Sequence, residues 1–576
     1  MLRLKKEISQ LLSPWTNIDA EQIQELLEIP PEKNMGDLSF PCFVLAKERR
    51  KPPALIAGEL ADRLRHQQGI YWNAVDSKGP YLNFHMNFNA LGGRVIEEIL
   101  AGRQWNEWCH EGEGGTVVID YSAPNIAKPF GVGHLRSTII GNALYLIYRA
   151  LGYNCVGINH LGDWGTQFGK LITAYTLWGE EQKLQDDPVD YAYELYVKFH
   201  QEAKNQESLE DDARDWFRRL EGGEKEALSL WKTFCQFSLE EFKRVYRILG
   251  IEFDYYHGES HYNPYLEQTL SLIKEKGITR MSDGALIVDL EKYGLPTSIL
   301  QKKDGTTLYM TRDIAAAIYR HEQFNFSRML YVVGSEQTLH FQQMFKILEL
   351  LGYDWAENCV HVPFGLIRFK EGRMSTREGN VILLEEVVDR AIALAGDIIE
   401  EKNPDLHDKE NAARIVGLGA IKFGDLSNDR IKNIDFDWEK VLDFSGETAP
   451  YIQYAHARIC SITRKAREEH RHLLSGHTDT MEMIKEFTAE EEECLVKELA
   501  LMPDAILRSA EADKPSLLAR YLINVAREFN RFYHNCPVLG AGDDKKTSSR
   551  LILIDATRIV LAGGLELLGI EAPEEM

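Results

Sequence analysis

The chain has 576 residues, of which 44% are hydrophobic and 27% are charged, and its formal net charge is −23. At roughly 150 residues per domain this length predicts about three to five domains. The eight cysteines are scattered without a CxxC pair, which argues against a zinc site and a disulfide framework and fits reduced thiols in the cytoplasm. No apolar run approaches the roughly 18 residues of a membrane span, and the N-terminal MLRLKKEISQLL is typical of an amphipathic helix, not of a secretory signal.

The first 110 residues alternate helical patterns with a strand-like segment at 79–87, GPYLNFHMN, and indicate a small α+β domain. CHEGEGG, residues 109–115, has the composition of a linker. Residues 116–160 then give a strand, a loop, a helix and a strand, which is a βαβ unit.

Residues 176–283 are mostly helical and charged, and strand and helix patterns alternate again after them. Strands are expected at 284–290, 299–310, 329–335 and 359–369, with helices at 311–324 and 338–352. Beyond about residue 385 every pattern is helical. The predicted fold class is therefore multidomain α/β: a split Rossmann-like domain with a helical insertion, a small α+β N-terminal domain and an all-α C-terminal bundle.

The loop between the first βαβ strand and its helix is unusually long and polar. SAPNIAKPFGVGHLRS, residues 122–137, occupies a position where ligands bind in open parallel sheets. Gly131 and Gly133 permit close approach of the backbone, the helix N-terminus offers N–H groups to phosphate, and Lys128 and His134 add a charge and a donor. A structural turn before a helix is the alternative interpretation.

A second polar loop follows the last predicted strand. In FKEGRMSTREGN, residues 369–380, Lys370, Arg373 and Arg377 surround Ser375 and Thr376, a pattern suited to clamping a triphosphate. An exposed charged hairpin is the alternative.

Taken together, the two loops resemble the HIGH and KMSKS motifs of class I aminoacyl-tRNA synthetases, in the forms GVGH and RMSTR. SAPNIAKPFGVGHLRSTIIGNAL, NHLGDWGTQFGK, YMTRDIAAAIYR, GSEQTLHF and the closing FYHNCPVL and LELLGIEAPEEM resemble arginyl-tRNA synthetases more narrowly, in the right order along nearly the whole chain. The resemblance implies an arginine–tRNA ligase that uses ATP with Mg²⁺ and no zinc, acts on tRNA(Arg) as a monomer, and needs tRNA to activate arginine.

The resemblance also implies roles for individual residues. A guanidinium substrate needs fixed acceptors, and Tyr309 and Asp313, four residues apart, match the family's arginine-binding pair. The other arginine contacts implied are Ala123, Pro124, Asn125, His134 and Gln337, with Ser122 and Glu259 as weaker candidates. The ATP contacts implied are Gly133, Gly334, Glu336, Met374 and Ser375. The catalytic groups implied are Lys128, Gly131, Gly133, His134, Arg373, Ser375 and Arg377.

Two regions are candidates for tRNA binding. KGPYLNF, residues 78–84, resembles the family segment that meets the tRNA D-loop, where Tyr81 offers a flat face and Asn83 an amide; a tyrosine packed in a small sheet is the alternative. The helix at 456–472 carries five Arg or Lys residues against two Glu. Its resemblance to the anticodon-binding region implies that Arg458 and Lys465 contact RNA; the alternative is that this face of the helix is simply exposed to solvent. The domain boundaries predicted on this basis are 1–110, 111–385 with an insertion at about 176–283, 386–440 and 441–576.

The motifs depart from the family pattern at three positions. Gly131 replaces the first histidine of HIGH, and Arg373 and Arg377 replace the two lysines of KMSKS. Lys128 is expected to supply the charge of the last lysine. Two alternatives stay open: a tRNA-binding protein without catalysis, suggested by Gly131, and an adenylating enzyme that passes arginine to an acceptor other than tRNA.

Overall fold

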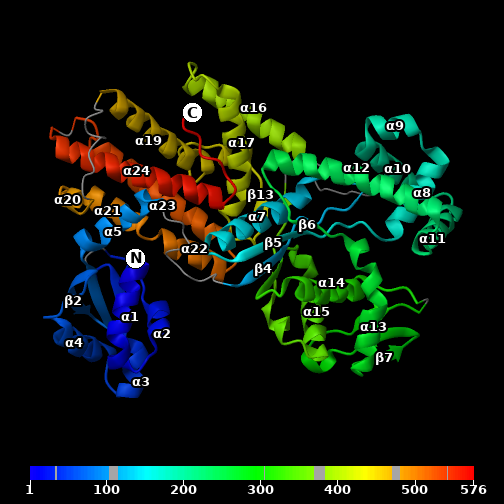
Figure 1. Ribbon diagram of the computed structural model, residues 1–576, viewed down its shortest axis with the longest axis horizontal. Helices are drawn as coiled ribbons and strands as arrows, with labels where there is room; N and C mark the ends of the chain where they lie inside the picture. Colours follow the sequence, from blue (N-terminus) through cyan, green and yellow to red (C-terminus); the bar gives the residue numbers. More distant parts are fainter. Residues whose placement is uncertain are drawn as a thin grey trace.

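The computed structural model describes residues 1–32, 35–102, 114–126, 128–303, 305–368, 383–469, 480–540 and 542–576. The molecule is elongated, with the N-terminal residues near one end, the parallel sheet toward the middle and the helices of an insertion at the other end (Figure 1). No helix among these residues is long and apolar enough to cross a membrane.

The N-terminal region is the small α+β unit that the sequence predicts. Strands β1 (Leu38–Pro41), β2 (Trp72–Lys78) and β3 (Tyr81–Met86) form an antiparallel sheet in the order β1-β3-β2, so that β3 is the predicted strand. Its helical segments are α1 (Leu2–Thr16), α2 (Ala20–Leu26), η2 (Cys42–Leu45), α3 (Ala46–Arg49), α4 (Pro53–Leu64) and α5 (Phe88–Leu100). Helix α5 packs against three helices of the C-terminal region, and thereby joins the two ends of the chain. These are α20 (Thr480–Ile484), α21 (Glu490–Leu499) and α24 (Asp544–Leu567).

A five-stranded parallel sheet forms the centre of the next region. Its order is β11-β10-β4-β5-β6, and all neighbouring strands are parallel. The strands are β4 (Thr116–Asp120), β5 (Asn154–Asn159), β6 (Tyr255–Tyr256), β10 (Arg328–Tyr331) and β11 (Cys359–His361). Because the chain leaves β4 toward β5 on one side and β10 toward β11 on the other, the carboxyl ends of β4 and β10 flank the switch point of a doubly wound sheet.

The two faces of the sheet are covered by different helices because successive strand residues point in opposite directions. Val117 and Ile119 join the core cluster that contains α7 (Leu135–Ala150), whereas Val118 joins the cluster of α14 (Tyr309–Phe324) and α15 (Thr338–Leu351). Helices α14 and α15 lie on the opposite side of the sheet from α7 (Figure 1). Strand β4 is therefore buried on both faces, in agreement with its continuous apolar run.

The helical insertion lies between β5 and β6. It comprises α8 (Thr166–Trp178), α9 (Glu181–Asp186), α10 (Pro188–Glu202), α11 (Ser208–Glu221) and α12 (Lys225–Leu249). After β6 come η4 (Glu259–Tyr265) and α13 (Leu266–Glu275).

The predicted strands at 284–290 and 299–310 do not extend the parallel sheet. Strands β7 (Thr279–Ser282), β8 (Ala285–Val288) and β9 (Ser298–Gln301), with η5 (Glu291–Tyr293) before β9, form a separate antiparallel sheet. The turn between β7 and β8 consists of Asp283 and Gly284, both with positive φ (49° and 81°). Such a two-residue turn joins antiparallel strands, since a parallel pair needs a crossover of a dozen or more residues. Tyr309 and Met310, predicted at a strand end, begin helix α14.

The C-terminal region is helical, as predicted, and one buried ion pair ties it to the sheet. Arg136 on α7 lies 2.9 Å from Asp425 on α17 (Lys409–Leu426), and both side chains are almost fully buried. The only pairing of strands described in this region joins β12 (Ile367–Arg368) to β13 (Ile434–Asp435). Two short 3-10 segments, η6 (Ser335–Gln337) and η7 (Asp354–Asn358), precede it. The helices are α16 (Leu384–Lys402), α17 (Lys409–Leu426), α18 (Trp438–Val441), α19 (Ala449–Glu469), α20 (Thr480–Ile484), α21 (Glu490–Leu499), α22 (Met502–Glu511), α23 (Pro515–Asn535) and α24 (Asp544–Leu567).

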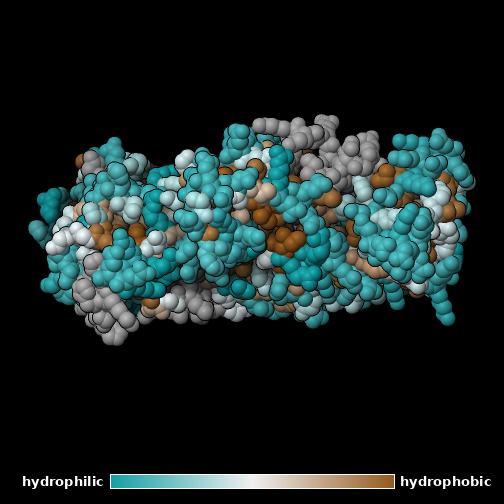
Figure 2. All heavy atoms as spheres, turned by 90° about the horizontal axis from the view of Figure 1, so that it is seen from above, coloured by the Kyte–Doolittle hydropathy of each residue, from teal (hydrophilic) through white to brown (hydrophobic). Residues whose placement is uncertain are grey.

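The surface of this elongated molecule is mostly hydrophilic in the view from above, with some hydrophobic residues gathered near the middle (Figure 2). This pattern fits the ordinary charged fraction of the composition.

Candidate active site

A pocket of about 350 Å³ opens at the carboxyl ends of β4, β5 and β10, at the switch point of the sheet. It brings together six residues that the sequence analysis selected from distant segments. These are Ala123, Asn125, Glu259, Tyr309, Asp313 and Gln337. The pocket is completed by Asp120, His160, Gly162, Ala316, Arg320, Tyr331, Val333, His340 and Phe341.

The backbone is strained where the chain leaves β4. Ser122 and Ala123 have φ values of 75° and 48°, a region that residues with a side chain rarely adopt and that often marks functional sites. The Ser122 hydroxyl lies 2.8 Å from the hydroxyl of Thr138 and 2.7 Å from that of Tyr246. Ser122 therefore holds the loop from inside and does not line the pocket, and Pro124 does not line it either.

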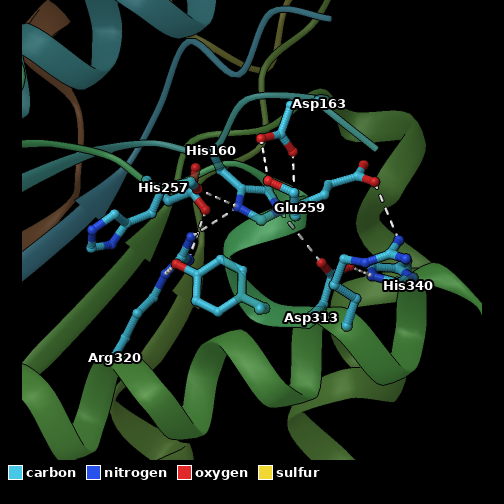
Figure 3. Close-up of polar contacts among 11 residues, drawn as sticks. His160, Asp163, His257, Glu259, Asp313, Arg320 and His340 are labelled. Carbon is cyan, nitrogen blue, oxygen red and sulfur yellow. Dashed lines mark hydrogen bonds and ion pairs between the residues drawn. The ribbon is translucent and has the colours of Figure 1, made fainter. Parts of the chain in front are cut away.

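Asp313 is the best-placed acceptor for a cation in this pocket. It lies one turn after Tyr309 on α14, so that both face the same side of the helix. His340 Nε2 lies 2.6 Å from Asp313 Oδ2, and His160 Nε2 lies 3.8 Å from Oδ1 (Figure 3). Tyr309 is 56% exposed, which leaves its ring at the mouth of the pocket.

Glu259 supplies a second carboxyl group. Its side chain is 14% exposed, and the Arg312 guanidinium lies 3.2 Å away. Burial raises the pKa of Glu259 to about 8, against the lowering effect of Arg312. In the pocket without a ligand, Glu259 is therefore mainly protonated at neutral pH.

A buried pair that the sequence analysis missed forms the floor of the pocket. Arg320 Nη1 lies 2.7 Å from Asp120 Oδ2, and its Nε donates to the Tyr262 hydroxyl at 3.2 Å. Tyr309, Asp313, Ala316 and Arg320 are spaced four, three and four residues apart on α14, the spacing of one helix face. That spacing was a usable signal for Arg320. His160 and His340 stand in the family-like segments NHLGDWGTQFGK and GSEQTLHF, but nothing there singled them out, and nothing local marked Asp120.

The GVGH segment lies at the start of α7 and does not line the 350 Å³ pocket. Gly131 forms an antiparallel bridge with Leu383, and the backbone N–H of Leu384 donates to the Phe130 carbonyl at 3.0 Å. Burial lowers the pKa of His134 to about 4, so its imidazole is neutral at pH 7. The ammonium group of Lys128 lies 5.5 Å from the ring centre of Tyr196 on α10, within the range of a cation–π interaction.

Three family models together cover most of the chain. The model described as "tRNA synthetases class I (R), catalytic domain" matches residues 95–438, "Arginyl tRNA synthetase N terminal domain" matches residues 2–86, and "DALR anticodon binding domain" matches residues 452–576. The chain belongs to the arginyl-tRNA synthetase family.

Relatives and solved structures agree with this family. The arginine–tRNA ligases of Alkaliphilus metalliredigens and Halothermothrix orenii are 46% and 45% identical, each over 100% of both chains. The arginyl-tRNA synthetase of Thermus thermophilus superimposes with a TM-score of 0.83 at 29% identity, covering 100% of this chain and 99% of that one. The predicted family and fold class are thus confirmed.

The remaining residues of the ATP prediction are only partly described. Gly334 forms a parallel bridge with Phe364 at the end of β10, and Glu336 is exposed beside it. Lys370, Arg373, Met374, Ser375, Thr376 and Arg377 lie outside the described residues. The described chain resumes at Leu383, which pairs with Gly131, so the residues that follow this loop lie beside the GVGH segment.

The predicted tRNA contacts differ in accessibility. Tyr81 is partly exposed and meets the half-exposed Phe43 edge to face, with ring centres 6.0 Å apart. Asn83 is 1% exposed, accepts from Ser39 at 2.7 Å and donates to Asp76 at 3.0 Å. Because both ends of its amide are used inside the sheet, Asn83 is not available to read a base in this conformation.

The two basic residues predicted on the long helix also differ. Arg458 on α19 lies over the rings of Tyr454 and Tyr533, at 4.6 and 4.8 Å from their centres. Lys465, one of the more exposed side chains of the same helix, lies 3.9 Å from Glu469. Arg458 with its two half-exposed tyrosines forms a cationic aromatic surface of the kind that RNA bases stack on.

Proposed function

We propose that this chain joins arginine to tRNA(Arg) in two steps, by forming arginyl adenylate from ATP and passing the arginyl group to the terminal ribose of the tRNA. The observation that carries the proposal is the convergence of Asp313, Tyr309, Glu259, Asn125 and Gln337 on one pocket in a member of the arginyl-tRNA synthetase family. The two carboxyl groups supply acceptors for a five-donor guanidinium, and the two amides add neutral hydrogen-bonding groups for the rest of the substrate.

We assign the guanidinium to Asp313 and Glu259, with Tyr309 covering it at the mouth of the pocket. The charge of Asp313 attracts the substrate cation, and the neutral amides of Asn125 and Gln337 suit its polar backbone end. Ala123 borders the same end, where the strained loop leaves β4. Asp120 and Arg320 neutralise each other below, so they shape the pocket without competing for the substrate.

We place ATP between the GVGH segment and the turn at Gly334 and Glu336, on either side of the switch point. His134, neutral at pH 7, would act there as a hydrogen-bond partner and not as a cation. Lys128 would carry the positive charge toward the α-phosphate, together with Arg373 and Arg377. Catalysis on this assignment is positioning and charge stabilisation, without a covalent enzyme intermediate.

Mg²⁺ would enter with the ATP phosphates and neutralise part of their charge. Within the described residues, no group of three or more His, Cys, Asp or Glu side chains is placed to hold a metal ion. We propose Tyr81, Arg458 and Lys465 as tRNA contacts, and action as a monomer in the cytoplasm. The free thiols of the seven described cysteines support a reducing compartment.

The test is exchange of labelled pyrophosphate into ATP, measured with arginine and with or without tRNA(Arg). Exchange that requires both arginine and tRNA supports the proposal, including the expectation that tRNA is needed for activation. No exchange under any condition, with tRNA binding intact, would identify a tRNA-binding protein without catalysis, the alternative that Gly131 suggests. Exchange without transfer to tRNA would favour an enzyme that uses another acceptor.

The arginine assignment is tested separately by Asp313→Asn. Removing one charge-assisted contact is expected to cost about 2–4 kcal/mol of arginine binding and to leave the KM for ATP nearly unchanged. Equal losses for arginine and ATP would make Asp313 a structural residue.

A further inference from the structure

His340 makes the shortest polar contact of the arginine pocket. It is the third residue of α15 and reaches across to α14, where its Nε2 lies 2.6 Å from Asp313 Oδ2 (Figure 3). Its ring packs edge to face against Phe341, with centres 5.5 Å apart. The side chains of His340 and Asp313 are 22% and 25% exposed, so solvent reaches the pair only partly.

The two oxygens of Asp313 have different surroundings. Oδ2 is bonded to His340, whereas the nearest contact recorded for Oδ1 is His160 Nε2 at 3.8 Å, beyond hydrogen-bond range. His160 is itself turned toward the floor of the pocket, because its Nδ1 lies 3.1 Å from the His257 carbonyl and 3.4 Å from Arg320 Nη2. Oδ1 is therefore the oxygen left for a ligand.

We propose that His340 is a positioning residue for arginine recognition: it holds Oδ2 of Asp313 and so fixes Oδ1 in the direction of the substrate guanidinium. This inference rests on the assignment of Asp313 to the guanidinium. A guanidinium fork binds a carboxylate well only in a narrow geometry, and an aspartate at the start of a helix could otherwise turn toward solvent. His340 acts through Asp313 and does not touch the substrate.

A competing role is an inhibitory one, in which His340 occupies Asp313 and must be displaced by arginine. The two roles differ in sign. A positioning residue that is lost weakens arginine binding, whereas a competitor that is lost strengthens it. A purely structural role would instead change arginine, ATP and thermal stability together.

The experiment measures the Kd for arginine on the full chain by calorimetry, and the KM for arginine, ATP and tRNA in aminoacylation. For His340→Ala we expect the Kd and KM for arginine to rise about 10- to 100-fold, the effect of losing one hydrogen bond to a charged group, with the KM for ATP within about twofold. His340→Gln places an amide N–H near the position of Nε2 and is expected to restore binding to within about threefold, whereas the shorter His340→Asn is not. Gln342→Ala, an exposed change on the same helix, is the control for disturbance of α15.

A double-mutant cycle with Asp313→Asn separates this inference from the proposed function. If His340 acts through Asp313, His340→Ala adds little to the loss already caused by Asp313→Asn. If Asp313→Asn leaves arginine binding intact, the arginine assignment itself fails. If Asp313→Asn weakens binding but His340→Ala does not, or if the Gln variant fails to rescue, only the positioning role is overturned.

Discussion

The affinity for arginine should rise with pH between 7 and 9, because Glu259 must lose a proton to bind a cation well. Burial places the pKa of Glu259 at about 8 in the pocket without a ligand. At pH 7, one unit below this value, about nine-tenths of the Glu259 side chains are protonated. A bound guanidinium favours the carboxylate and lowers its pKa, so arginine binding releases up to about one proton at pH 7.

The magnitude follows from this shift. If bound arginine brings the pKa of Glu259 below 7, the Kd falls about tenfold from pH 7 to pH 9, most of it between 7 and 8. The stability of the ligand-free fold changes with pH in the opposite direction to the affinity for arginine. The folded pKa lies above the usual 4.5, so the ligand-free protein loses stability as pH rises from about 4.5 to about 8, by up to about 1.4 kcal/mol per unit.

The assay is calorimetry of arginine binding at several pH values, in pairs of buffers with different ionisation enthalpies, which counts the protons released. Glu259→Gln is the matched control, because the amide keeps the size and cannot titrate. The variant should release no proton from this site, and its Kd should be nearly independent of pH, apart from the titration of arginine itself. An unchanged proton count in Glu259→Gln, or a flat Kd in the parent protein, would refute the reasoning.

Three further predictions concern catalysis, tRNA binding and stability. Lys128→Ala should lower single-turnover adenylation about 10²–10³-fold, the scale for losing one preorganised donor, with partial rescue by Lys128→Arg; near-normal adenylation alongside a collapse in Arg377→Ala would assign the charge to Arg377. Tyr81→Ala should raise the KM for tRNA by the equivalent of one base stack, about 1–3 kcal/mol, without loss of fold. Asn83→Ala should instead lower the stability of the fold, because it removes the hydrogen bonds of Asn83 with Ser39 and Asp76. If Tyr81→Ala does not affect charging of full-length tRNA, the D-loop assignment is wrong. Arg136→Met should lower the free energy of unfolding in denaturant by about 3–5 kcal/mol, because it leaves the buried Asp425 and the carbonyls of Gly365 and Lys432 unpaired. The control Arg65→Met breaks an exposed pair with Asp62 and should lower it by at most about 1 kcal/mol. Equal effects of the two changes would contradict the role of the buried pair.

Local patterns in the sequence were sufficient for the elements that bury a continuous face. The β4–α7–β5 unit and the C-terminal helices follow directly from apolar periodicity. Periodicity does not say which sheet a strand joins, so the patterns at 284–290 and 299–310 did not show that β8 and β9 belong to a separate antiparallel sheet. The positive φ of Asp283 and Gly284, which makes β7 and β8 a hairpin, is visible in the sequence only as the dipeptide Asp-Gly.

Pocket residues were predicted where the family resemblance gives them a role, and were missed where their role follows only from contacts in the fold. Tyr309, Asp313 and Gln337 match positions to which the family resemblance gives a role in arginine binding. His340 and His160 also stand in family-like segments, but their role follows only from their contacts with Asp313, which is 27 residues away from one and 153 from the other. Asn83 shows the reverse. Its neighbours in sequence suggested an accessible amide, but β1 brings Ser39 beside it and buries it.

Gly131 keeps the backbone pairing seen at this motif position but lacks the side chain of the family's histidine. Its φ and ψ of −87° and 165° are extended values that any residue adopts, so the backbone does not require glycine. The contacts that the structure shows here are made by the backbone: Gly131 bridges Leu383, and Phe130 accepts from Leu384. A histidine at this position would add a side-chain donor beside this backbone pairing. Glycine lacks that donor but keeps the backbone contact between the GVGH segment and the residues that enter α16. On the assignment proposed above, Lys128, Arg373 and Arg377 would supply the positive charge near the phosphates, and Lys128→Ala should therefore be more damaging here than in an enzyme that retains the histidine.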